Sequence, residues 1–161
     1  MTAHTHADEP IHFAGGTLDE YRHVCAFFDS FDEEAKVLLP FVKDGLERGE
    51  KAFHIVDPEL KHDYTVRLQA EGIDVPSAVG RGQFELRTWL EAYLREGRFD
   101  QDAMLALIEE VLQNGTAQGF PRTRLVAHME WALEDRPGVN DLVEYETRLN
   151  YVLPRYKDPV I

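Results

Sequence analysis

The sequence predicts an α/β protein, built as a three-layer sandwich around a mostly parallel sheet. Two observations predict this class. From about Tyr21, short segments that are apolar or that alternate between apolar and polar residues are interspersed with longer segments of helical periodicity. Turn and cap residues separate these segments. Because strands that alternate with helices are joined by right-handed crossovers, we expect helices on both faces of the sheet.

The first predicted strand covers residues 23–29, which are nearly all apolar, as expected for a strand buried on both faces. A helix follows, because Ser30 stands three residues before Glu33, the spacing of a capping box. Apolar residues at helical spacing carry this helix to Gly49, and a kink is expected at Pro40.

The second predicted strand covers residues 51–56. Asp57 has the residue type of a helix N-cap, and Pro58 suits the first helical position. The helix that they begin is expected to end at Gly72, followed by a connection over residues 73–82 with one short helical turn.

The third predicted strand, residues 83–88, alternates between polar and apolar residues, which is typical of a strand near a sheet edge. Residues 89–97 are expected to be helical in part. A long helix then begins at Asp100, since Asp is a common N-cap and Phe99 with Met104 has the spacing of a hydrophobic staple.

The fourth predicted strand covers residues 124–129, and a last helix follows with an apolar face. Residues 158–161 resemble the start of one more strand. No repeat, low-complexity tract or linker divides the chain. We therefore expect a flexible arm over residues 1–20 and a single domain over residues 21–161, truncated at its C-terminal strand.

Composition narrows the function. A net charge of −13 and a pI near 4.9 argue against direct binding of nucleic acid, which needs a basic face. There is no basic cluster for a membrane surface, no signal-peptide pattern in residues 1–10 and no apolar stretch long enough for a bilayer. The one cysteine, Cys25, favours a reducing cytoplasm.

Nine ordered blocks of the sequence resemble the MEDS domain, the sensory domain of methanogens, methylotrophs and the regulator DcmR. The resemblance covers about residues 21–161. The blocks are residues 23–30, 38–41, 44–51, 56–58, 72–74, 92–94, 97–100, 129–133 and 144–146.

This resemblance implies a bacterial or archaeal sensory domain that responds to hydrocarbon derivatives and is often fused to DNA-binding, histidine-kinase or anti-sigma modules. The family's organisation also resembles RecA- and KaiC-like ATPases, which implies a RecA-like fold with a degenerate nucleotide site. Family members usually continue beyond residues 159–161, and this chain carries no recognisable output module. Any signal would then pass to a regulatory partner protein in trans, and a second subunit could supply the missing part of the sheet.

A nucleotide cofactor is not expected. A P-loop needs glycines, a lysine and a hydroxyl to hold phosphates and Mg²⁺. The equivalent turn, residues 29–34, has no glycine or lysine and several carboxylates, which repel phosphate. We therefore expect no ATPase activity, no cofactor and no catalytic residue.

The candidate ligand-binding residues stand mainly where predicted strands end, because the carboxyl ends of parallel strands line one crevice. Ser30 and Asp57 also have an alternative role as helix caps, and Glu130 could pair with a nearby arginine. The aromatic candidates could equally be core residues. The set is Asp29, Ser30, Asp57, Trp89, Tyr93, Glu130, Trp131 and His23.

Three hypotheses follow. The leading one is a cytoplasmic sensory domain that binds a small, largely apolar ligand, a hydrocarbon derivative. The second is a ligand-free interaction module that pairs with another chain, including a second copy, at the sheet edge after residues 159–161. The third is a metal-dependent enzyme using His23, His54 or His128. The absence of a metal-binding motif favours core histidines and no metal, and Cys25 is expected to be buried.

Overall fold

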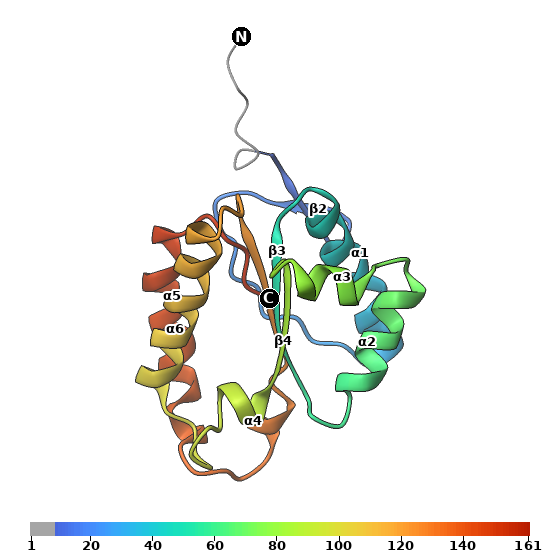
Figure 1. Cartoon of the computed structure of the whole chain (residues 1–161). Coiled ribbons are helices and arrows are strands. Elements are labelled where there is room, and N and C mark those ends of the chain that lie inside the picture. Colours follow the sequence, from blue (N-terminus) through green and yellow to red (C-terminus); the bar gives the residue numbers. More distant parts are fainter. Residues whose placement is uncertain (1–8) are drawn as a thin grey trace.

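The structure, a computed structural model, describes residues 9–161 and is an α/β sandwich of three layers (Figure 1). Its central sheet is formed by β3 (Lys51–Val56), β4 (Phe84–Thr88) and β5 (Thr123–Ala127), which run parallel in the order β4-β3-β5. The predicted class is confirmed. The prediction of an edge strand is also confirmed, because β4 lies at one edge while all six residues of β3 are buried.

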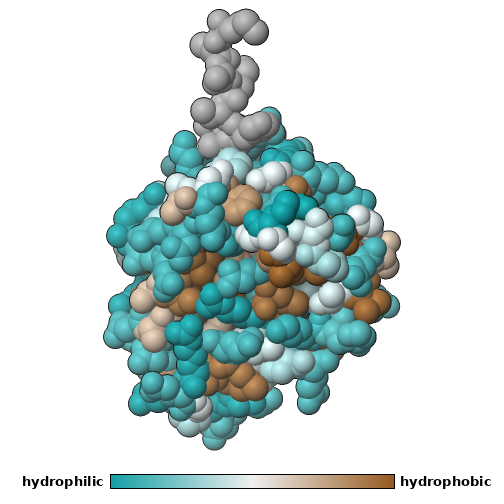
Figure 2. All heavy atoms as spheres, in the orientation of Figure 1, coloured by the Kyte–Doolittle hydropathy of each residue, from teal (hydrophilic) through white to brown (hydrophobic). Residues whose placement is uncertain are grey.

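Helices cover both faces of the sheet. On one side lie α5 (Gln101–Ala117) and α6 (Leu142–Val152), and on the other lie α1 (Phe31–Glu47), α2 (Lys61–Ala70) and α3 (Val75–Gly80) (Figure 1). A single turn, α4 (Trp89–Ala92), follows β4. In the same view the surface is mostly hydrophilic, with hydrophobic residues towards the middle of the face (Figure 2).

Two hydrophobic cores fill the space between these layers. Alternate residues of a strand point to opposite faces, and β3 follows this rule. Phe53 and Ile55 pack with α5 and α6, whereas Ala52 and Val56 pack with α1 and α2. Within the described part of the chain, no helix is long and apolar enough to cross a bilayer.

The helix caps that the sequence predicts are largely correct. Ser30 Oγ accepts the Glu33 N–H at 3.2 Å, and the Glu33 carboxylate accepts the Asp29 N–H at 2.7 Å. Asp100 accepts the N–H groups of Asp102 and Ala103, both at 3.0 Å. These caps fix the start of α1 and of α5.

The predicted start of α2 at Asp57 is wrong. Asp57 Oδ1 accepts the Glu59 N–H at 2.8 Å, and its carbonyl accepts the Leu60 N–H at 3.1 Å. Asp57 therefore stabilises a separate turn after β3. The helix begins only at Lys61, without a side-chain cap.

The first predicted strand is also wrong over most of its length. Its beginning pairs with the C-terminal segment, because Val160 N–H donates to Arg22 O at 2.8 Å and Val24 N–H donates to Val160 O at 2.9 Å. The residues beyond form no strand, and Cys25 and Phe27 are exposed. An apolar run alone therefore misidentified a segment that is not buried on both faces.

The C-terminal segment, residues 159–161, extends the sheet beyond β5, as the sequence predicts. Leu125 N–H donates to Pro159 O at 3.0 Å, Ile161 N–H to Leu125 O at 3.0 Å and Ala127 N–H to Ile161 O at 2.9 Å. Since the other side of this segment bonds residues 22–24, it lies between two neighbours. The structure gives no support here for the open edge of the second hypothesis.

Residues 9–20, expected to belong to a flexible arm, include a β-hairpin. Its strands are β1 (Ile11–Phe13) and β2 (Gly16–Leu18), which pair antiparallel. Ile11 is fully buried, and the ring of Phe13 packs edge-on against Phe41 of α1 at 5.5 Å. This contact makes the hairpin part of the domain, while residues 1–8 lie outside the described residues.

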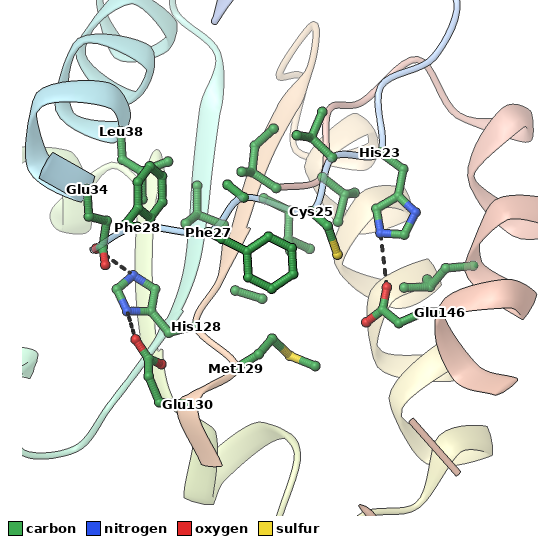
Figure 3. A pocket seen from close by; sticks show the side chains of 18 of the residues that line it. His23, Cys25, Phe27, Phe28, Glu34, Leu38, His128, Met129, Glu130 and Glu146 are labelled. Carbon is green, nitrogen blue, oxygen red and sulfur yellow. Dashed lines mark ion pairs between the residues drawn. The ribbon is translucent and has the colours of Figure 1, made fainter. Parts of the chain in front are cut away.

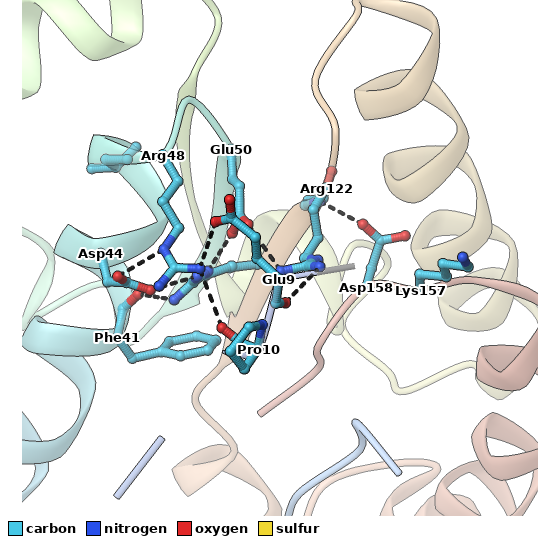
Figure 4. Close-up of polar contacts among 12 residues, drawn as sticks. Glu9, Pro10, Phe41, Asp44, Arg48, Glu50, Arg122, Lys157 and Asp158 are labelled. Carbon is cyan, nitrogen blue, oxygen red and sulfur yellow. Dashed lines mark hydrogen bonds and ion pairs between the residues drawn. The ribbon is translucent and has the colours of Figure 1, made fainter. Parts of the chain in front are cut away.

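A buried ion network lies at the amino end of β5 (Figure 4). Arg124 contacts Glu50 at 2.5 Å and Asp44 at 2.8 Å, and Arg122 contacts Glu50 at 2.9 Å. Arg124 passes so close to α1 that a Cβ at Gly45 would lie 2.6 Å from its Cδ. Both arginines and Glu50 are at least 98% buried, so mutual pairing offsets the loss of their hydration.

Candidate functional site

A pocket of about 320 Å³ lies beside the carboxyl end of β5 (Figure 3). Residues 23–28 form one wall, and α1, α5 and α6 contribute the others. Most of its lining is apolar, including Phe28, Leu38, Ile108, Met129, Leu149 and Val160. A pocket of this size and lining is typical of a small-molecule site.

Two of the lining side chains are large, apolar and open to solvent. Phe27 is 93% exposed and Leu133 is 90% exposed. They come from segments without strand or α-helix, one before α1 and one in the 3₁₀ turn η2 (Glu130–Leu133). The mouth of the pocket is thus apolar as well as its interior.

At one end of the pocket, two carboxylates flank the imidazole of His128 (Figure 3). His128 Nε2 lies 3.3 Å from Glu34 Oε1, and Nδ1 lies 3.6 Å from Glu130 Oε1. Neither nitrogen of this ring, nor Glu34 Oε1, makes a hydrogen bond within residues 9–161, because the close approaches lack the required geometry.

Three separate elements bring this cluster together. Glu34 belongs to the first turns of α1, His128 directly follows β5, and Glu130 begins η2. His128 is 6% exposed and Glu34 is 9% exposed. Burial raises the pKa of Glu34; His128 and Arg67 oppose this rise, and Glu130 adds to it.

Behind His128 the site is closed by core residues. The Tyr64 ring lies edge-on to His128 at 5.7 Å, and the Tyr64 hydroxyl is 2.9 Å from His54 Nδ1. Burial, with a contribution from His128, lowers the pKa of His54 to about 3. His54 is therefore a neutral core histidine, as favoured by the sequence.

At the opposite end of the pocket lies a second histidine–carboxylate pair (Figure 3). His23 Nε2 is 3.2 Å from Glu146 Oε2, and Nδ1 is 2.9 Å from Asn150 Oδ1. Burial acts to lower the pKa of His23, but contacts with Glu146 and Asn150 outweigh it and raise this pKa. Both ring nitrogens of His23 thus have partners, unlike those of His128.

Three of the residues predicted from the sequence line this pocket, namely His23, Tyr93 and Glu130. Tyr93 is buried, and its ring packs edge-on to Tyr145 with the centroids 6.4 Å apart. Glu130 faces His128 rather than an arginine, the alternative that the sequence left open. Their contact with a ligand remains a prediction.

The polar candidates Asp29, Ser30 and Asp57 do not line this pocket. Ser30 caps α1, and Asp57 stabilises the turn after β3. Asp29 is exposed, and its N–H bonds Glu33. The alternative role as a helix cap therefore accounts for Ser30, whereas Asp57 has a structural role in a turn and not as a cap.

The two tryptophans do not form a wall of this pocket. Trp131 is fully buried, with ring centroids 5.0 Å from Tyr93 and 5.2 Å from Phe99. Trp89 is 7% exposed and lies under the guanidinium of Arg136. Both are core residues, the alternative that the sequence left open.

Sequence reasoning did not select Glu34, His128 or Glu146 as ligand residues. Glu34 stood among carboxylates of a helix start, and Glu146 on the polar side of the last helix, so neither had a distinctive signal. His128 was considered only as a metal ligand or as a core histidine, and the second interpretation was favoured. Its significance depends on Glu34, a partner 94 positions away that folding places 3.3 Å distant.

Comparison with known proteins gives one family. The family model "MEthanogen/methylotroph, DcmR Sensory domain" matches residues 22–159. The transcriptional repressor DcmR of Methylorubrum extorquens (strain DSM 6343 / CIP 106787 / DM4) is 28% identical over 149 residues. That alignment covers 92% of this chain and 52% of the relative, so the chain spans about half of the relative's length.

No solved structure matches this chain. The family model, however, covers nearly the whole of the described domain, including every residue that lines the pocket except Val160 and Ile161. This match agrees with the ordered sequence blocks, and the protein belongs to the MEDS family of sensory domains.

Proposed function

We propose that this sensory domain binds a small, largely apolar molecule, a hydrocarbon derivative, in the pocket beside β5 and signals its presence to a partner protein. The observation that carries the proposal is an apolar pocket of about 320 Å³ with titratable groups at both ends. Apolar walls supply most of the binding free energy, while a few polar groups orient the ligand.

Charge further limits the ligand. Among the described residues that line the pocket, Glu34, Glu130 and Glu146 carry carboxylates, and none is a lysine or arginine. An anionic ligand would meet repulsion without a fixed positive charge to offset it. The pocket therefore favours neutral or cationic derivatives over carboxylates and phosphates.

The pocket wall also offers a route for a signal. Residues 25–28 belong to no strand or helix, and backbone hydrogen bonds to the C-terminal segment hold only the residues before them. A ligand that packs against this wall would favour one arrangement of it. Phe27 and Leu133, exposed at the mouth, would then present a different surface to the partner.

Family membership and the relative's name support regulation over catalysis. A transcriptional repressor is a regulator, and the alignment with it covers 92% of this chain, most of which is the sensory domain. In the proposal, the signal passes to a separate partner protein. That partner would be recognised because its binding to this domain changes when a ligand occupies the pocket.

A ligand screen tests the proposal. Haloalkanes, short alcohols, thiols, amines and carboxylates are screened by thermal shift and native mass spectrometry. Ala127→Leu fills the pocket, and Ala106→Leu makes the same change at an exposed position of α5. We expect a neutral or cationic compound to bind wild type and Ala106→Leu at one equivalent, and Ala127→Leu about tenfold more weakly.

Two outcomes would contradict the proposal. One is that no member of the panel binds. The other is that Ala127→Leu binds every compound as tightly as Ala106→Leu does, which would place binding elsewhere.

A ligand-free interaction module is the second candidate, because Phe27 and Leu133 expose apolar surface at one site. This candidate predicts self-association or partner binding without any small molecule. Light scattering after size exclusion distinguishes the two candidates. If the second is correct, the double change Phe27→Ser and Leu133→Ser abolishes association of the protein. A protein that is a strict monomer at all concentrations would exclude a homo-oligomer.

A further inference from the structure

We propose that Glu34, His128 and Glu130 form a binding site for one divalent transition-metal ion. This inference goes beyond the proposed function, because metal binding does not depend on the organic ligand. All three residues line the pocket, so the ion would also offer a coordination position to a ligand's donor atom.

The first argument is convergence. One ligand atom from each residue lies within 4.8 Å of the other two. His128 Nε2 and Glu34 Oε1 are 3.3 Å apart, close to the separation of about 3.4 Å expected between two ligands of a tetrahedral zinc ion. The three residues come from three elements, so the fold and not local sequence creates the arrangement.

The second argument is that the cluster is buried yet unsatisfied. His128 and Glu34 are more than nine-tenths buried, and in the part of the chain that the structure describes His128 Nδ1, His128 Nε2 and Glu34 Oε1 have no hydrogen-bond partner. Leaving such groups without partners is costly. A divalent cation would satisfy the nitrogen and offset the repulsion between the two carboxylates.

An imidazolium held between two carboxylates is the alternative. It would need N–H groups pointed at both oxygens, but neither approach has hydrogen-bond geometry, and one is 3.6 Å long. A metal on Nε2 instead needs only a movement of Glu130. Its side chain is 48% exposed, so it is free to turn towards the ion.

The donor set defines the class of ion. One imidazole nitrogen with carboxylate oxygens suits Zn²⁺, Fe²⁺, Mn²⁺ or Co²⁺ better than Ca²⁺ or Mg²⁺, which prefer oxygen alone. Three protein ligands leave at least one position open. His23 and Glu146 provide a matched control in the same pocket, because Asn150 and Glu146 already occupy the nitrogens of His23.

The experiment is a metal titration of the full chain without an affinity tag and without organic ligand. Zn²⁺ binding is measured by calorimetry and Co²⁺ binding by visible absorption. His4→Gln and His6→Gln are introduced in every sample to remove competing imidazoles. We expect one equivalent to bind, His128→Gln and Glu130→Gln to weaken binding at least tenfold, and His23→Gln and Glu146→Gln to leave it unchanged.

Glu130→Gln keeps the test decisive if His128→Gln does not fold, since an exposed side chain can be changed without loss of the core. Absence of stoichiometric binding, or binding unchanged in Glu130→Gln, would overturn the inference. So would equal losses in His23→Gln and His128→Gln. The ligand screen is run in EDTA, so failure of metal binding and failure of the proposed function are separate results.

Discussion

Two polar clusters at opposite ends of β5 differ in how completely their charges are paired. At the amino end, Arg122 and Arg124 meet Glu50 and Asp44 at 2.5–2.9 Å (Figure 4). At the carboxyl end, His128 stands between carboxylates without a hydrogen bond inside the described region (Figure 3). Both clusters are largely buried, so burial alone does not distinguish them.

The difference separates structure from function. A buried ion pair need not add net stability, but it must stay paired, since removal of one partner leaves an uncompensated charge. An unsatisfied cluster costs stability, and it is tolerated where binding completes it. Only the carboxyl-end cluster lines the pocket, so we propose that the amino-end cluster serves folding and the carboxyl-end cluster serves sensing.

The largest expected effect is at the amino end. Glu50→Gln leaves Arg122 and Arg124 without their shared carboxylate and should lower the unfolding free energy by about 3–5 kcal/mol. Urea unfolding followed by the fluorescence of the two buried tryptophans, Trp89 and Trp131, measures it. Glu110→Gln, at an exposed position of α5, is the control. If Glu50→Gln lowers the unfolding free energy no more than the control does, the network has no structural role.

A second effect depends on pH. Burial raises the pKa of Asp158 from 3.8 to about 6, although Thr123 N–H and Arg122 oppose the rise. A raised folded-state pKa means that folding favours the protonated acid. The contribution of Asp158 to stability is thus most favourable below about pH 4, falls as pH rises towards 6 and is least favourable above it.

Asp158→Asn should remove this penalty, because an amide oxygen can still accept the Thr123 N–H. We expect a gain of at most about 3 kcal/mol at pH 8 and almost none at pH 3.5. Unfolding at both pH values measures the difference, and Asp135→Asn, an exposed change, serves as reference. A gain that is equal at the two pH values would contradict the role of Asp158 ionisation.

A smaller effect of opposite sign to that of Glu50→Gln is expected at the carboxyl end. Glu34→Gln removes a buried carboxylate that faces Glu130, and in EDTA it should stabilise the protein by about 1 kcal/mol. With Zn²⁺ present, wild type should be more stable than Glu34→Gln, because only wild type gains stability from the ion. Destabilisation in EDTA similar to that of Glu50→Gln would abolish the contrast between the two ends.

The smallest effect on stability is expected at the mouth. Phe27 is 93% exposed, so Phe27→Ser should change the unfolding free energy by less than about 0.5 kcal/mol. The same change should weaken a ligand of the pocket several-fold, measured by thermal shift and native mass spectrometry. Unchanged ligand affinity would show that the mouth takes no part in binding.

Local signals explain what the sequence predicted of the fold. The burial of β3, the caps Ser30 and Asp100 and the periodicity of α5 each lie within a few neighbouring residues. The first predicted strand was wrong because its pairing depends on Val160, more than 130 positions away. A local sequence pattern cannot show how many residues of a segment pair with a strand that lies so far away in the sequence.

The site was predictable only in part for the same reason. Glu130 was found because ligands gather where strands end, whereas His23 stands at the beginning of the first predicted strand and had no such signal. Glu34 and His128 gain meaning only when α1 is placed against β5. Trp131 was selected by position, yet it follows His128 by three residues in a 3₁₀ turn that directs its ring into the core.

The methionine methyl groups provide the most direct test of ligand binding in this pocket. Met129 lines the pocket, whereas Met104 is buried outside it. In protein labelled with ¹³C at the methionine methyl groups, a ligand from the panel should shift the Met129 signal and leave that of Met104 in place. A ligand that binds without moving Met129, or that moves both signals equally, would contradict the assignment of the pocket as the sensing site.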